Sequence, residues 1–153
     1  MAAIFVALAI EFARERTPLQ RDLILALTAD EEGGVVSPDG RWIIFRSSEN
    51  GEREVFVDSF PEPKRRLQVS QGRSLELSWG DSGRSIVFLQ GSKVSRVPFD
   101  PQAGRVAGPS RVVYESPAIL AVQADPTTER VLVARRAPGS EKPPVLRVVL
   151  PAG

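Results

Sequence analysis

Apolar residues in most of this chain fall in short runs that are separated by turn residues. The clearest run covers residues 42–45, Trp-Ile-Ile-Phe, and it lacks the alternation of apolar and polar positions typical of a strand with one wet face. The turn before it contains Pro38, which fixes φ, and Gly40, which accepts a positive φ. The pattern therefore predicts a chain reversal followed by a strand that is buried on both faces.

This combination of turn and strand recurs along the chain at a regular spacing. Arginines at the equivalent turn position, Arg41, Arg84 and Arg130, stand 43 and 46 residues apart. Four short strands in about 40–45 residues is the period of a β-propeller blade. The fold class that we expect is mainly β, with two to three blades of an incomplete β-propeller. The other expected strands are 54–58, 66–70, 74–79, 85–89, 93–97, 110–114, 118–122, 131–134 and 145–150.

The turn sequences themselves carry a family resemblance. Residues 37–42 read SPDGRW, residues 80–84 read GDSGR, and residues 125–130 read DPTTER. They resemble the blade turns of WD-like propellers of the Tol-Pal (TolB-like) type, which also occur as C-terminal domains of bacterial serine/threonine kinases. The resemblance covers residues 35–153 and implies a scaffold or sensor role, with a setting in the bacterial envelope or periplasm. It implies blades at about 35–73, 74–114 and 118–150.

Residues 1–34 differ in character from the rest of the chain. They contain three basic and six acidic residues, and the composition changes at the glycine pair 33–34. We expect this segment to consist of a helix followed by a short buried strand over residues 23–27. The first ten residues are apolar, but no basic residue precedes them and Glu11 follows them. We therefore expect neither a signal peptide nor a membrane-spanning helix.

The end of this segment resembles a second family. Residues 21–34, RDLILALTADEEGG, are similar to the central strand and acidic loop of two-zinc peptidases of the aminoacylase and glutamate-carboxypeptidase type. By that resemblance Glu31 is the general base that activates a zinc-bound water, and Glu32 is a zinc ligand. The family also uses histidine ligands, and this chain contains no histidine. Zinc is therefore expected only under this alternative, and the remnant is expected to be inactive.

Composition narrows the possible functions further. Without histidine the chain cannot supply a serine or cysteine triad, so the sequence around Ser82, which matches the nucleophile loop of trypsin-like proteases, is expected to be a blade turn. With no cysteine there is no disulfide framework, and a net charge of +1 gives no reason to expect nucleic acid as a partner. Aromatic residues at repeat-equivalent positions, Trp42, Trp79 and Phe88, are expected in the core between blades, the alternative being a ligand groove.

Two function hypotheses from different classes follow. The first is a non-enzymatic propeller-type module whose loops or open edge contact a protein or peptide. The second is a zinc-dependent hydrolase remnant that uses Glu31 and Glu32. A third possibility is that the chain has no evolved function of its own. Because an incomplete array leaves blade edges unpaired, self-association through those edges is also expected.

Overall fold

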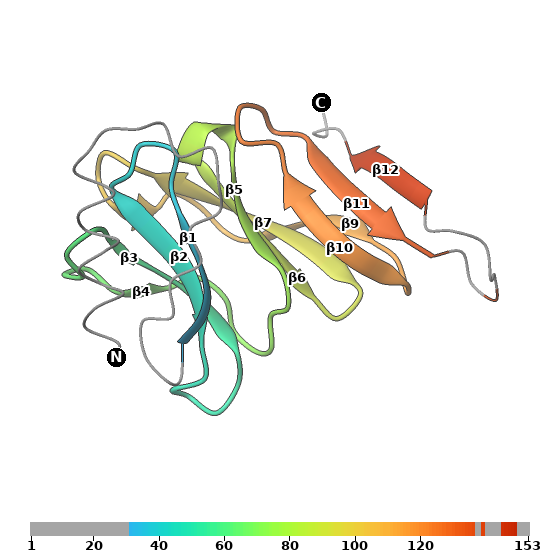
Figure 1. Cartoon of the computed structure of the whole chain (residues 1–153), viewed down its shortest axis with the longest axis horizontal. Coiled ribbons are helices and arrows are strands. Elements are labelled where there is room, and N and C mark those ends of the chain that lie inside the picture. The colour runs from blue at the N-terminus through green and yellow to red at the C-terminus, as the bar shows by residue number, and fades with distance from the viewer. Residues whose placement is uncertain (1–30, 137–138, 140–144, 150–153) are drawn as a thin grey trace.

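Three antiparallel β-sheets follow one another along the molecule. The computed structural model describes residues 31–136, 139 and 145–149, and within them it shows the three sheets side by side in chain order (Figure 1). The first sheet has the order β1-β2-β3-β4, with strands Glu31–Val36, Trp42–Ser47, Glu54–Ser59 and Leu67–Gln68. The mainly β fold class that the sequence predicts is confirmed.

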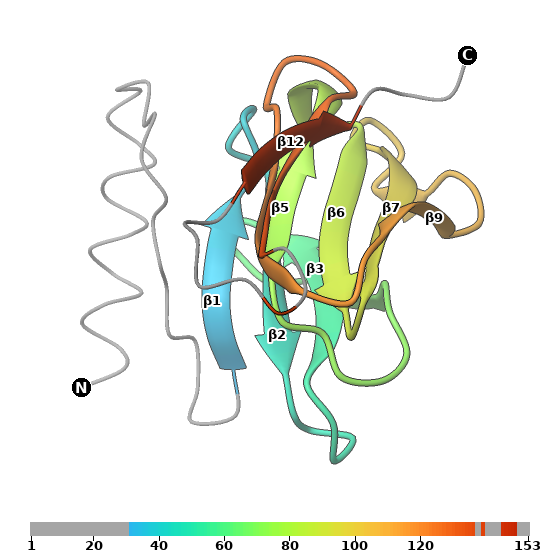
Figure 2. The same ribbon diagram turned by 90° about the vertical axis from the view of Figure 1, so that its right-hand side faces the viewer.

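The second and third sheets repeat this antiparallel plan. The second contains β5 (Leu77–Gly80), β6 (Ser85–Gln90), β7 (Lys93–Asp100), β8 (Arg105–Val106) and β9 (Arg111–Glu115), and a 3-10 turn over Asp81–Gly83 joins its first two strands. Both β8 and β9 pair with β7. The third contains β10 (Ile119–Ala124), β11 (Val131–Arg135) and β12 (Val145–Val149) in that order. Figure 2 looks along this row of sheets, with the third sheet nearest the viewer.

The four apolar residues at the start of β2 are buried on both faces of the first sheet, as their sequence predicts. Their exposed fractions are 7% for Trp42, 1% for Ile43, 0% for Ile44 and 1% for Phe45. Trp42 and Ile44 face the second sheet, whereas Ile43 and Phe45 pack with Phe56 on the opposite face. The prediction of a strand that is buried on both faces is therefore confirmed.

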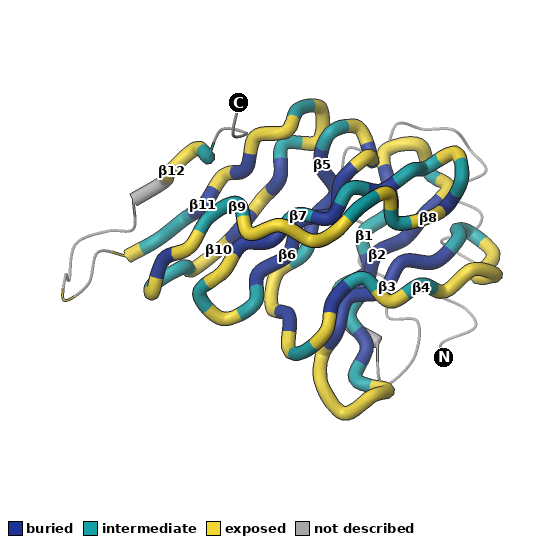
Figure 3. The backbone as a smooth tube through the Cα atoms, turned by 180° about the vertical axis from the view of Figure 1, so that it is seen from behind, coloured by how far each residue is buried: buried dark blue, intermediate teal, exposed yellow. Residues whose placement is uncertain are grey.

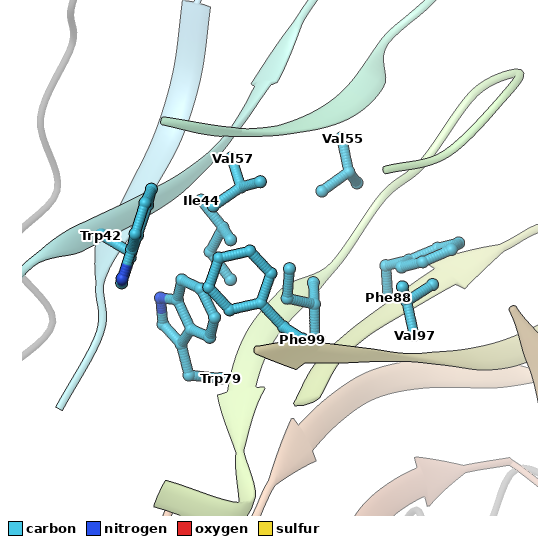
Figure 4. Close-up of a cluster of buried hydrophobic side chains, with 9 residues drawn as sticks. Trp42, Ile44, Val55, Val57, Trp79, Phe88, Val97 and Phe99 are labelled. Atoms are coloured by element: carbon cyan, nitrogen blue, oxygen red, sulfur yellow. The ribbon is translucent and has the colours of Figure 1, made fainter. Parts of the chain in front are cut away.

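Aromatic rings dominate the core between the first and second sheets, which we call the first inter-sheet core (Figure 4). The Phe99 ring makes edge contacts with two indoles, at centroid distances of 5.3 Å from Trp42 and 5.5 Å from Trp79. Both indole N–H groups are satisfied, since Trp42 donates to the Pro101 carbonyl and Trp79 to the Val35 carbonyl. The prediction that repeat-equivalent aromatics form inter-blade core is confirmed.

A second, aliphatic core lies between the second and third sheets. Val87, Leu89 and Val94 of the middle sheet pack there against residues of β10 and β11, namely Val122, Ala124, Val131 and Val133. All seven side chains are at most 5% exposed. The middle sheet is thus covered on both faces, because alternate residues of β6 point to opposite sides.

The structure differs from the expected strand boundaries at several places. β1 begins at Glu31 and crosses the glycine pair 33–34, where a shift in register interrupts its pairing with β2. The strand expected over 66–70 is only two residues long, and β5 begins at Leu77 although the alternation predicted a start at residue 74. The helix and strand expected before residue 31 lie outside the described residues. Their assignment to a separate segment 1–34 stays a prediction.

Candidate functional site

The two residues that the sequence proposes for zinc chemistry lie in β1. Backbone pairing sets Glu31 opposite Ser47 and Glu32 opposite Arg46. The expectation that an acidic loop carries these two glutamates is therefore wrong, because hydrogen bonding to β2 extends the sheet through the glycine pair. Their roles as base and ligand stay predictions, since their side chains are outside what the structure describes. Among the described residues no group of three or more acidic side chains is placed to hold a metal ion.

Three turns stack at one end of the sheets, one from each repeat. The backbone N–H of Asp81 donates to the carbonyls of Asp125 and Thr128, and that of Ser82 donates to Pro126 at 2.6 Å. A Cβ added to Gly83 would lie 3.5 Å from Cδ of Pro38, so the first turn is in contact as well. The Gly-Asp-Ser-Gly sequence is thus a packed turn between two others, as its repeat register predicts.

The carboxylate of Asp39, in the first turn, is hydrogen-bonded to other residues of the same turn. Asp39 accepts hydrogen bonds from the Ser37 hydroxyl at 2.6 Å and from the backbone and side chain of Arg41. Burial raises the pKa of Asp39, but hydrogen bonds from Ser37 and Arg41 outweigh that effect and hold the pKa below its usual value. This group stabilises the turn and is not available as a general base.

Asp125 accepts hydrogen bonds within the third turn, as Asp39 does in the first. Its pKa leads us to expect that the stability of the protein depends on pH. Hydrogen bonds, first that of the Thr127 backbone N–H, lower the pKa of Asp125 from 3.8 to about 2. Because the folded-state pKa is below the unfolded value, the stabilisation is fully present above pH 3.8 and is lost as the pH falls through about 2. In urea unfolding, the stability advantage of the wild-type chain over Asp125→Asn should therefore shrink between these pH values. An advantage that does not change across this range would contradict the assignment.

A recess of about 480 Å³ lies between the outer parts of the first and second sheets, beside β4 and β6. Its lining is uncharged and mixes side-chain amides and hydroxyls with two apolar residues: Gln68, Val69, Ser70, Gln71, Phe88, Gln90 and Ser110. The volume is within the range of sites that bind small molecules or a few residues of a peptide. We therefore consider this recess as a candidate ligand site.

The hydrogen bonds of two glutamines in the lining fix the orientation of their side-chain amides. Nε2 of Gln68 donates to Oε2 of Glu54 and to the Ser70 carbonyl, both at 2.9 Å. Nε2 of Gln90 donates to the carbonyls of Gln71 and Gly72, at 2.6 and 3.2 Å. All these acceptors lack a proton to give, so the amide nitrogens must face them. Each amide then has its carbonyl oxygen left to accept a bond, and no donor among the described residues occupies it.

A buried carboxylate stands behind Gln68. Glu54 is 8% exposed, and besides Gln68 it accepts hydrogen bonds from the Asn50 side chain and the Gly72 backbone, both at 3.0 Å. The side-chain bond from Asn50 and the backbone bond from Gly72 lower the pKa of Glu54, so the carboxyl group is ionised at neutral pH. These three partners are neutral. The carboxylate ties the β2–β3 hairpin, β4 and the following linker together.

No pattern in the sequence indicates this site. Gln68 and Gln90 are ordinary polar residues, 22 positions apart, at the ends of strands in different sheets. The linker after β4 brings them together, because its carbonyl groups accept both amide hydrogens of Gln90. Only Phe88, which lines the recess from the first inter-sheet core, was singled out by its pattern.

The outer face of the third sheet is a second exposed surface. Leu132 and Val148 are directly opposite each other on β11 and β12 and are 39% and 55% exposed. Figure 3 shows an exposed position between two buried ones at the start of β11. The self-association expected of an open blade edge stays a prediction. Within the described part of the chain, no helix is long and apolar enough to cross a bilayer.

Comparison with solved structures agrees with the arrangement of the sheets. TolB from Acinetobacter baumannii superposes with a TM-score of 0.57 at 16% identity, covering 74% of this chain and 29% of TolB. The fold is of the TolB-like propeller type. An oligogalacturonate lyase in complex with manganese gives a TM-score of 0.49 at 16% identity, covering 66% of this chain and 28% of the lyase.

The chain thus spans less than a third of the length of either structure. No protein-family model matches the sequence, and no curated protein matches it. The likeness to two-zinc peptidases that residues 21–34 suggest has no support from these comparisons, whereas the TolB-like likeness is supported at the level of the fold. The WD-like and bacterial aspects of that resemblance stay predictions.

Proposed function

We propose that this TolB-like scaffold is a non-enzymatic binding module that holds a peptide segment of a protein partner in the recess between its first and second sheets. The observation that carries the proposal is the uncharged lining of the recess, in which side-chain amides and hydroxyls lie beside two apolar residues. A peptide in extended form has N–H and C=O groups along its backbone that need partners, and preformed partners lower the cost of ordering it.

The walls of the recess are held in place before any ligand arrives. Ser70 anchors the linker, since its hydroxyl accepts the Val55 N–H at 2.8 Å and lies 3.0 Å from the Ser74 hydroxyl. Gln90 clamps the same linker from the second sheet. Phe88 at the base is 1% exposed and belongs to the first inter-sheet core. Because these walls are already ordered, ligand binding would not have to offset the entropy cost of ordering them. This favours a role in binding.

Selection of random peptides on the purified chain tests the proposal. Peptides enriched on the wild-type protein should bind Ser110→Trp at least about tenfold more weakly, because the exposed Ser110 lines the recess and an indole there would fill it. Fluorescence anisotropy with labelled peptides measures the affinities.

Gln123→Trp provides the matched control, because it adds the same indole at an exposed position of the third sheet. It should leave peptide affinity unchanged, and both variants should melt at the wild-type temperature. Selection that enriches no peptide, or peptides that bind Ser110→Trp as tightly as the wild-type chain, would contradict the proposal.

A further inference from the structure

We infer that Asn50, at the tip of the β2–β3 hairpin, is a site of spontaneous deamidation, and that the carboxylate formed there loosens the hydrogen-bond network around Glu54. The inference goes beyond the proposed function, because it needs neither a ligand nor a partner. It depends on two features of the hairpin: an exposed Asn-Gly pair at its tip, and a buried carboxylate that accepts a hydrogen bond from the Asn50 amide.

The Asn50-Gly51 pair has the features that this reaction needs. The backbone nitrogen of Gly51 attacks Cγ of the Asn50 side chain, the bond from Cγ to Nδ2 breaks, and Nδ2 leaves as ammonia with the proton of the attacking N–H. Water then opens the five-membered imide at either carbonyl, which gives aspartate or isoaspartate. The attacking nitrogen is unhindered, because a Cβ built on Gly51 would meet no atom within 4 Å.

Local opening of the hairpin tip brings the two groups together. In the closed turn the Gly51 N–H donates to the Ser48 carbonyl at 2.8 Å, and Nδ2 of Asn50 donates to Glu54 at 3.0 Å. Both bonds must break before the ring can close. Residues 49–53 are all exposed, so breaking these bonds uncovers little apolar surface and requires only a local fluctuation. We therefore expect the reaction to proceed in the folded protein.

The product places a second carboxylate beside Glu54. Glu54 is 8% exposed, and its Oε2 atom accepts hydrogen bonds from both Asn50 and Gln68. An ionised aspartate at position 50 has no hydrogen to donate, so the bond from Nδ2 is lost and a negatively charged oxygen takes its place. The two carboxylates repel each other, which drives the hairpin tip away from Glu54.

The effect extends to the linker after β4. The Oε1 atom of Glu54 accepts the Gly72 N–H at 3.0 Å, and the Gly72 carbonyl accepts an amide hydrogen of Gln90. Displacing Glu54 therefore removes a support of residues 69–72, and the first three of these line the recess. Deamidation at the hairpin tip thus links the age of a molecule to the order of this linker.

Mass spectrometry of the full chain, incubated at neutral pH and physiological temperature, tests the site. Asn50 is the only asparagine in the chain, so a gain of one mass unit in the tryptic peptide 47–53 is assigned to it. Asn50→Gln is the matched control, because the same reaction there needs a six-membered ring, and it should gain mass at least about tenfold more slowly. An equal gain in Asn50→Gln, or a folded wild-type chain that shows no gain after the free peptide 47–53 has reacted completely, would overturn the inference.

Variants at the same position test the effect on the network. Asn50→Asp should lower the melting temperature by about 4 °C. Asn50→Ala loses the same hydrogen bond without adding a charge, so it should lower the melting temperature by less. Gln123→Glu adds an equal charge at an exposed position of the third sheet and should shift the melting temperature by less than about 1 °C.

The amide proton of Gly72 reports the state of Glu54 directly. Its nuclear magnetic resonance signal should move upfield in Asn50→Asp, because its hydrogen bond to Glu54 weakens, and it should stay in place in Gln123→Glu. Equal melting temperatures of Asn50→Asp and Asn50→Ala, or an unchanged Gly72 signal in Asn50→Asp, would show that the new carboxylate leaves the network intact and would reject that part of the inference.

Discussion

Phe99→Ala is expected to lower the free energy of unfolding by about 4 kcal/mol. Phe99 is 2% exposed and its ring lies between those of Trp42 and Trp79. Removing it leaves a cavity lined by two rigid indoles, which cannot collapse without breaking their hydrogen bonds to Pro101 and Val35. The loss therefore includes a cavity cost in addition to the loss of buried apolar surface.

Urea unfolding followed by tryptophan fluorescence measures this effect, because the two tryptophans of the chain both contact the deleted ring. Val112→Ala is the control for truncation of an apolar side chain, since Val112 is 52% exposed and the change should cost less than about 0.5 kcal/mol. If Phe99→Ala is too unstable to purify, Phe99→Leu should still show a loss, of about 1–2 kcal/mol. A loss no greater than that of Val112→Ala would show that the aromatic cluster does not hold the two sheets together.

Gly104→Ala should destabilise the protein by about 3 kcal/mol through a different mechanism. Gly104 has φ +63°, and a Cβ built on it would clash with the indole of Trp42, where the Cζ2 atom would be 2.7 Å away. The turn between β7 and β8 would have to move, or the indole would have to leave its place beside Phe99. Either change disturbs the hydrogen bond from Trp42 to Pro101.

Gly91→Ala separates the clash from the cost of the backbone conformation. Gly91 has a similar φ of +57°, but a Cβ there would meet no atom within 4 Å. It should therefore cost only about 1 kcal/mol. Thermal unfolding of both variants, together with the maximum of tryptophan emission, provides the measurement. Equal losses in the two variants would mean that Trp42 yields to the added methyl group at little cost.

The strands after residue 40 could be predicted because turn chemistry and apolar runs agree there. Gly40 has φ +71° in the structure, as its position in the turn requires, and the run 42–45 is buried throughout. The glycine pair 33–34 misled the prediction because glycine is rare in strands. In the folded chain Gly33 takes φ +64° at the register shift, so the strand continues across it. Pairing with β2 overrides the local preference.

The candidate site could not be predicted in the same way. A strand over 66–70 was expected from its pattern, but regular pairing ends at Gln68. The backbone N–H groups of Val69 and Ser70 both donate to the Val55 carbonyl, and the Ser70 hydroxyl accepts the N–H of Val55. The chemistry of the candidate site depends on the direction in which Gln68 and Gln90 donate, which follows from contacts between residues distant in sequence. Patterns of apolar and polar positions contain no information about such directions.

Because both faces of the middle sheet are covered, its strands should open to solvent less often than those of the other two sheets. Ile86 and Phe88 of β6 belong to one inter-sheet core, Val87 and Leu89 belong to the other, and none of the four exceeds 2% exposure. A fluctuation that detaches the third sheet uncovers only one row of these side chains and leaves the other core closed. The amide hydrogens of β6, which contributes two side chains to each core, are therefore expected to be among the slowest to exchange with solvent in the described part of the chain.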